Sequence, residues 1–81
     1  MDKYIDYCAQ CGTSKIYDEE PVIVTRRVPD DVIEATLNGY TCPWCGYKYR
    51  LYAPLYDTSD VEHVKEMIAN ASKELAKAGG D

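Results

Sequence analysis

Two short cysteine motifs constrain this chain more than any other feature, because together they use all four of its cysteines. They are Cys8-Ala9-Gln10-Cys11-Gly12 and Cys42-Pro43-Trp44-Cys45-Gly46. Two thiolates three positions apart can bind one metal ion if the chain turns tightly between them, and the following glycine allows a positive φ as the backbone leaves the metal. Two such motifs supply Cys₄, a closed tetrahedral site that is structural with zinc and electron-transferring with iron. We therefore predict a metal site formed by Cys8, Cys11, Cys42 and Cys45.

Two other uses of the cysteines agree less well with the sequence. Structural disulfides are typical of small secreted domains, but Met1-Asp2-Lys3-Tyr4 leads to the first motif without an apolar signal segment. A catalytic dithiol would suit Cys42-Pro43-Trp44-Cys45, but such a motif belongs near a βαβ unit, for which the preceding chain leaves no room. We therefore expect free thiols that bind metal in a reducing compartment.

Length and charge narrow the class of protein. At 81 residues the chain is one small domain, in which hydrophobic burial barely exceeds the lost chain entropy. A structural zinc ion contributes roughly 10–16 kcal/mol in small zinc peptides, so we expect the metal to hold the cysteine-bearing part together. The 9 basic and 14 acidic residues give a net charge of −5, which opposes general binding to nucleic acid. No stretch approaches the roughly 18 consecutive apolar residues of a membrane-spanning helix.

Residues 1–57 are predicted to form the metal-binding domain, and most of its regular elements are expected to be strands. Residues 15–17 and the β-branched segment 21–28 are typical of strands. Residues 47–52 alternate with period two, which predicts a half-buried antiparallel strand that leaves the second motif.

Residues 29–39 have two interpretations. Asp31 and Glu34 have approximately the spacing of a capping box, and Asn38-Gly39 would end a helix, so we predict a short helix here. The alternative is a strand that ends in an Asn-Gly hairpin turn. In either case the 30 residues between Cys11 and Cys42 exceed the gap of about 15–20 that is common in paired modules, which indicates an insertion.

Residues 58–81 are predicted to form a C-terminal amphipathic helix and tail. Ser59-Asp60-Val61-Glu62 is a capping box, and Gly79-Gly80 would end the helix. Apolar residues recur along it at steps of three and four, at Val61, Val64, Ile68, Ala71, Leu75 and Ala78. Such a stripe either packs on the chain's own sheet or pairs with a second helix, in a homo-oligomer or in a partner.

The two cysteine motifs and the aromatic segment 47–52 resemble the zinc-ribbon class of the rubredoxin-like fold, over roughly residues 4–56. The resemblance implies a small α+β metal-bound domain: a zinc-ribbon-like antiparallel sheet with two Cys-x-x-Cys knuckles. To this the sequence adds the short inserted helix and the C-terminal helix. Members of the class occur in transcription factors, polymerase subunits, ribosomal proteins and small adaptors, so the fold alone does not name a function.

Rubredoxin is the neighbouring family. The early Cys-x-x-Cys-Gly, the acidic chain and Pro29-Asp30-Asp31 ahead of the second motif are similar to rubredoxins, and imply iron and electron transfer as an alternative. Segments 13–17 and 32–40 depart from that pattern because they are longer, and the C-terminal helix is foreign to it.

The residues best suited to bind a partner are aromatic and basic. Trp44 lies between two cysteines at a knuckle tip, and Arg26, Arg27, Lys48 and Arg50 would gather around it if their strands are neighbours. Such a cluster suits an acidic protein surface or single-stranded nucleic acid, and the net charge favours the protein.

No catalytic constellation accompanies the cysteines. His63, the single histidine, is expected to be solvated on the terminal helix, and the carboxylates lack the pattern of an acid–base pair. We therefore predict a cytoplasmic, non-enzymatic protein with one structural Zn²⁺ that acts as a protein-interaction adaptor or regulator, for example of transcription or translation machinery. The alternatives are an iron electron carrier and a nucleic-acid-binding zinc ribbon.

Overall fold

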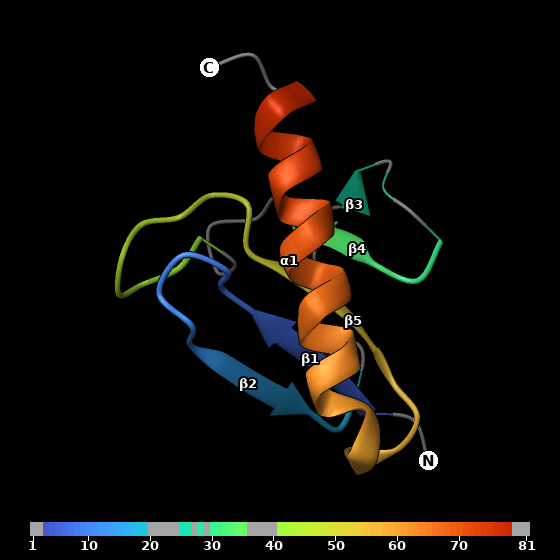
Figure 1. The fold of residues 1–81 in the computed structure, drawn as a ribbon. Coiled ribbons are helices and arrows are strands. Elements are labelled where there is room, and N and C mark those ends of the chain that lie inside the picture. The colour runs from blue at the N-terminus through green and yellow to red at the C-terminus, as the bar shows by residue number, and fades with distance from the viewer. Residues whose placement is uncertain (1–2, 20–24, 27, 29, 36–40, 79–81) are drawn as a thin grey trace.

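A computed structural model describes residues 3–19, 25–26, 28, 30–35 and 41–78 of the chain. Within these residues, five strands form one antiparallel sheet in the order β2-β1-β5-β4-β3, and a single long helix lies across one face of it (Figure 1). The strands are β1 (Lys3–Tyr7), β2 (Ser14–Tyr17), β3 (Thr25–Arg26), β4 (Ile33–Ala35) and β5 (Leu51–Leu55). A turn of 3-10 helix at Thr58–Asp60 leads into helix α1 (Val61–Ala78).

Strand β5 is the centre of the sheet, although it is the last strand in the sequence. It pairs with β1 on one side, with Tyr7 opposite Leu51, and with β4 on the other, with Ile33 opposite Tyr52. Because β1 and β5 are antiparallel, the end of β1 lies beside the start of β5. The chain that follows β1 and the chain that precedes β5 therefore meet at one end of the sheet.

The main core lies between the sheet and α1. Successive side chains of a strand point to opposite faces, and Leu51, Ala53 and Leu55 of β5 share the face that α1 covers. The buried core residues are Ile5, Val32, Leu51, Ala53, Leu55, Val64, Ile68 and Ala71. A second, smaller cluster occupies the other face of the sheet, where Tyr52 is fully buried against Tyr4, Tyr17 and Ile33.

Helix α1 confirms the predicted C-terminal helix, and its apolar stripe packs on the chain's own sheet. The predicted start differs in detail: Asp57, and not Ser59, supplies the cap, since its Oδ1 accepts a hydrogen bond from the Ser59 backbone N–H at 3.0 Å. The intervening 3-10 turn moves the first α-helical residue to Val61. Residues of the predicted C-terminal segment 58–81 therefore share one hydrophobic core with strands of the predicted segment 1–57.

One element prediction is right only at residues 51–52, and another is wrong. The strand expected at 47–52 lies at Leu51–Leu55, because the second cysteine motif occupies the chain as far as residue 47 and a turn follows at 48–49. The short helix expected over 29–39 is contradicted by β4 at Ile33–Ala35, where pairing with β5 outweighs the local capping signals. The alternative of a strand is therefore correct for those residues, whereas Asn38-Gly39 lies outside the described residues.

The other strand predictions succeed in part. The strand predicted at 15–17 is confirmed by β2. In the predicted strand 21–28, the described part is Thr25–Arg26, which forms β3, and residue 28. Strand β1 was not predicted, although Tyr4-Ile5-Asp6-Tyr7 has the alternation of a short strand and Ile5 is buried in the core.

Candidate metal centre

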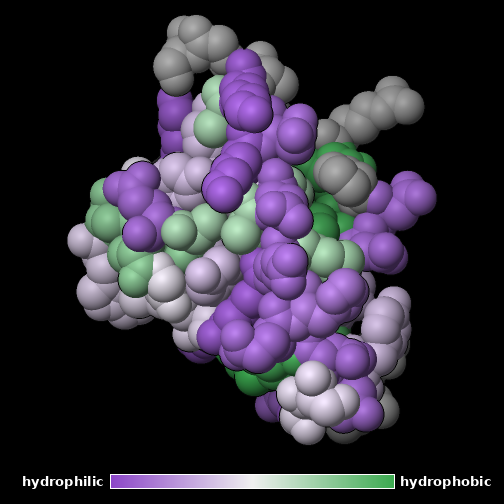
Figure 2. Space-filling view, in the orientation of Figure 1, coloured by the Kyte–Doolittle hydropathy of each residue, from purple (hydrophilic) through white to green (hydrophobic). Residues whose placement is uncertain are grey.

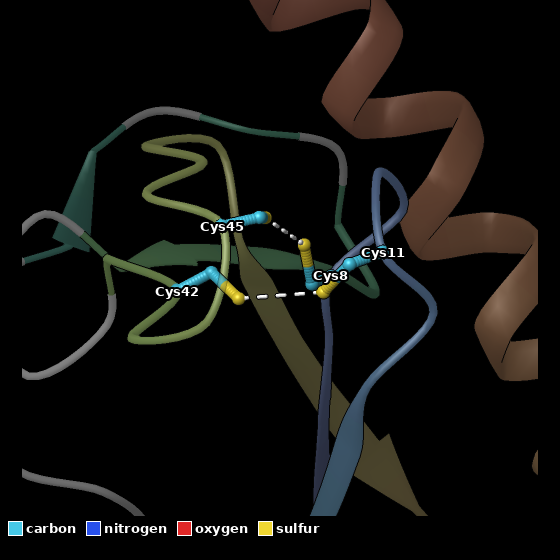
Figure 3. Close-up of side chains that lie close together, drawn as sticks. All are labelled: Cys8, Cys11, Cys42 and Cys45. Carbon is cyan, nitrogen blue, oxygen red and sulfur yellow. Dashed lines mark hydrogen bonds between the residues drawn. The ribbon is translucent and has the colours of Figure 1, made fainter.

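The pairing of β1 with β5 brings the two cysteine motifs together. The first knuckle (residues 8–13) connects β1 to β2, and the second knuckle (residues 42–47) lies shortly before β5. Tyr7 and Leu51 are register partners, so both knuckles are at the same end of the same strand pair. Figure 3 shows the cysteine side chains of the two loops directed toward one another.

Both knuckles have the same backbone conformation. The first cysteine of each donates its N–H to a carbonyl five residues later, from Cys8 to Thr13 at 2.9 Å and from Cys42 to Tyr47 at 3.1 Å. Its own carbonyl accepts a 2.8 Å hydrogen bond from the N–H of Gly12 or Gly46. The two glycines have φ of +82° and +74°, as the motif predicts. Each loop thus turns tightly enough to direct two sulfur atoms at one point.

The four sulfur atoms have the spacing of a tetrahedral metal site. All four Sγ atoms lie within 4.8 Å of one another. Across the knuckles, Cys8 Sγ is 3.5 Å from Cys45 Sγ, and Cys11 Sγ is 3.5 Å from Cys42 Sγ (Figure 3). A tetrahedron with metal–sulfur bonds of about 2.3 Å has edges of about 3.8 Å. All four cysteines are free of disulfides, so all four predicted ligands are available to bind metal. A divalent ion that accepts thiolate ligands fits this set.

The electrostatics of the cluster also favour a cation. Burial tends to raise the pKa of Cys42, but hydrogen bonds from the backbone N–H groups of Cys45 and Trp44 and from the Thr13 hydroxyl lower it to about 5. Burial raises the pKa of Cys8, whereas a hydrogen bond from Thr13 lowers that of Cys11. Removal from solvent and the neighbouring thiols raise the pKa of Cys45 to about 12. Four thiolates this close need a metal ion to offset their mutual repulsion.

A buried ion pair between Arg50 and Asp6 lies beside the cysteine cluster. Arg50 Nη2 donates to Asp6 Oδ1 at 2.5 Å, and both side chains are almost completely buried. Arg50 Nη1 donates to Thr13 Oγ1 at 3.0 Å and lies 3.6 Å from Cys42 Sγ. Burial alone would lower the pKa of Arg50, but the hydrogen bond and charge of Asp6 outweigh it and raise that pKa. Arg50 therefore carries a fixed positive charge beside the cysteine sulfurs.

This support was missed by sequence reasoning. Asp6 and Arg50 are 44 residues apart, and only the register of β1 against β5 makes them neighbours. Thr13 Oγ1 lies 3.2 Å from Cys11 Sγ and 3.7 Å from Cys42 Sγ, so its hydroxyl touches both knuckles. The only advance signal was that a charged residue, Asp6, stands inside a segment that alternates like a strand.

The predicted cluster around Trp44 is found only in part. Trp44 is 70% exposed, and the guanidinium of Arg50 lies 5.8 Å from the centre of its ring. Arg50 differs from the expected exposed contact because it is 4% exposed and paired with Asp6. Lys48 is exposed and lies over the ring of Tyr49 at 5.6 Å. The side chain of Arg26 and all of Arg27 lie outside the described part of the structure.

Comparison of the chain with family models, with curated proteins and with solved structures found no match.

In the described part of the chain, no helix combines the length and apolar character needed to cross a membrane. His63 is exposed on α1, as expected, and it lies outside the described metal-binding cluster. The class of molecule that fold and site define is thus a small α+β domain with a four-cysteine metal-binding cluster.

Proposed function

We propose that this protein is a zinc-ribbon-like domain in which Cys8, Cys11, Cys42 and Cys45 hold one structural Zn²⁺. The observation that carries the proposal is the convergence of four free sulfurs within 4.8 Å of one another from two knuckles of the same conformation. All four ligands come from the chain, which leaves no open position for a substrate. The ion would cross-link the ends of β1 and β5, and such a closed site supports the proposal of a non-enzymatic role.

We further propose that the domain acts as a protein-interaction adaptor or regulator in the reducing cytoplasm. Trp44 supports this role, since a 70% exposed indole on a loop held by two metal ligands is a rigid contact for a partner. The guanidinium of Arg50 lies 5.8 Å from the centre of the Trp44 ring, within the range of a cation–π attraction. The net charge of −5 favours a protein over nucleic acid.

Metal analysis tests the first part of the proposal. Native mass spectrometry of the purified protein should show one zinc ion per chain with four deprotonated thiols. A red, iron-containing protein would contradict the structural zinc and favour the rubredoxin-like electron carrier. A native mass that shows disulfides would contradict both.

A pair of substitutions tests the adaptor role. Trp44→Ala should reduce the amount of a co-purified partner while zinc stays bound, because the indole is not a ligand. Ile16→Ala is the matched control, since Ile16 is also an exposed apolar residue, 47% exposed on β2. Equal loss in both variants would indicate non-specific adhesion. Sub-micromolar binding of labelled single-stranded RNA at about 0.15 M salt, lost in Arg26→Ala/Arg27→Ala, would instead favour the nucleic-acid-binding alternative.

A further inference from the structure

A groove runs beside α1, on the side where the chain enters β4. It consists of two adjoining hollows with volumes of about 380 and 240 Å³. Asp31 and Met67 line both hollows, so the two are neighbours along the helix. Along α1 the lining runs from Asp60, just before the helix, to Glu74. At about 1.5 Å per residue this is roughly 20 Å, the length of four helical turns. We call this feature the α1–β4 groove.

The floor of the groove is apolar. Val32 and Ala71 of the buried core line one hollow, Val64 lines the other, and the partly buried Met67 lines both. At one end stands Tyr56, which is 75% exposed. Figure 2 shows hydrophobic residues beside the hydrophilic outer face of α1, on the side of β4. Methionine and tyrosine are typical of binding surfaces, because a methionine adapts its shape and an exposed tyrosine supplies contact area.

The rim of the groove is acidic. Asp30, Asp31, Asp60 and Glu74 line the two hollows, and all four are exposed. Among the described residues that line the two hollows, the one basic side chain is that of His63. The ion pairs in the described part of the chain join Lys3 to Asp18 and Arg50 to Asp6, and neither includes a rim residue. An apolar floor between exposed carboxylates is complementary to a segment with apolar side chains on one face and positive charges beside them.

We propose that the α1–β4 groove is a docking site for a basic amphipathic segment of a partner protein, a helix of about four turns. Its apolar side chains would lie on Val32, Met67 and Ala71, and its lysines and arginines would face the acidic rim. This surface is distinct from Trp44: in Figure 1 the loop that carries the second knuckle lies on the opposite side of α1 from β3 and β4. The proposal does not depend on which metal the cysteines hold.

The test uses the metal-loaded full chain, labelled with ¹⁵N, and a synthetic 15-residue peptide with leucines along one helical face and lysines beside them. Amide shifts should move at residues 30–32 and along the groove side of α1, and the knuckles should stay unchanged. A second peptide, in which glutamate replaces every lysine, should not bind. Perturbations spread over the acidic surface, or centred elsewhere, would overturn the proposal, as would equal binding of the glutamate peptide.

Two charge reversals separate the groove from the overall charge. Asp31→Lys changes the residue common to both hollows and should weaken the lysine peptide about tenfold. Glu62→Lys makes the same change on an exposed residue of α1 that does not line the groove, and should alter the affinity by no more than about twofold. Both residues are exposed, so both variants should fold. Equal weakening by the two substitutions would show attraction by net charge and refute a groove.

Discussion

The buried pair between Arg50 and Asp6 yields the sharpest prediction about stability. Arg50→Met keeps an unbranched side chain of similar reach but removes the charge, which leaves the Asp6 carboxylate 2% exposed without its cation. Breaking a buried ion pair by removing one partner costs about 3–5 kcal/mol. Asp6 keeps its hydrogen bond from the Tyr17 hydroxyl at 2.8 Å, so we expect a value near the lower end, about 3 kcal/mol.

Such a loss is large for a domain of this size. Domains are stable by about 5–15 kcal/mol in total, and 1 kcal/mol shifts the Tm of a domain of this length by roughly 4–8 °C. Arg50→Met should therefore lower the Tm by roughly 12–24 °C. Urea unfolding of the zinc-loaded proteins, followed by far-UV circular dichroism, measures the free energy directly.

Two further variants make the reasoning refutable. Lys3→Met breaks the other described ion pair, Lys3–Asp18 at 2.6 Å, whose side chains are 46% and 81% exposed. Solvent screens that pair, so its loss should cost far less. The double variant Arg50→Met/Asp6→Leu removes both buried charges and should recover a substantial part of the stability lost in Arg50→Met. If Arg50→Met costs no more than Lys3→Met, the burial argument is wrong.

Three other predictions concern the knuckles and the core. Gly46→Ala should destabilise the protein by about 1–2 kcal/mol in urea unfolding. The cause is the backbone φ of +74° alone, since a Cβ added at Gly46 meets nothing within 4 Å. Gly46→Asn should cost less, because asparagine tolerates this conformation. Ile68→Ala empties a fully buried position and should cost about 2–5 kcal/mol, whereas Glu66→Ala, on the exposed side of the same helix, should change the free energy of unfolding little. Zinc binding at pH 7 should release the protons of Cys8 and Cys45, whose pKa values are raised, and the affinity for zinc should fall as the pH falls. Calorimetry in buffers of different ionisation enthalpy measures both the proton release and the affinity. Zinc binding without proton release would contradict the assignment of these cysteines as ligands.

The predicted features that the structure bears out are those set by residues close together in the chain. The metal-binding cysteines follow from a three-residue spacing, the positive φ of Gly12 and Gly46 from their place after the second cysteine, and α1 from a repeat of three and four. Each depends on the geometry of one turn, which a few neighbouring residues determine. The same local reasoning failed at 29–39, where capping signals indicated a helix and pairing with β5 produced a strand.

Which distant residues become neighbours depends on how the strands and the helix pack together. The central position of β5, the burial of Arg50 against Asp6, and the groove between α1 and the chain entering β4 all depend on strand order and register. Arg50 shows the difference most clearly. In the sequence it is one more basic residue near a tryptophan, whereas in the fold it is a buried positive charge that pairs with Asp6 and lies next to Cys42 Sγ. The metal-binding cysteines and the turns that present them can be predicted from the sequence, because they depend on residues that are close together in the chain. The partners of each charge and the hollows on the surface arise from packing between segments far apart, so they exist only once the chain has folded.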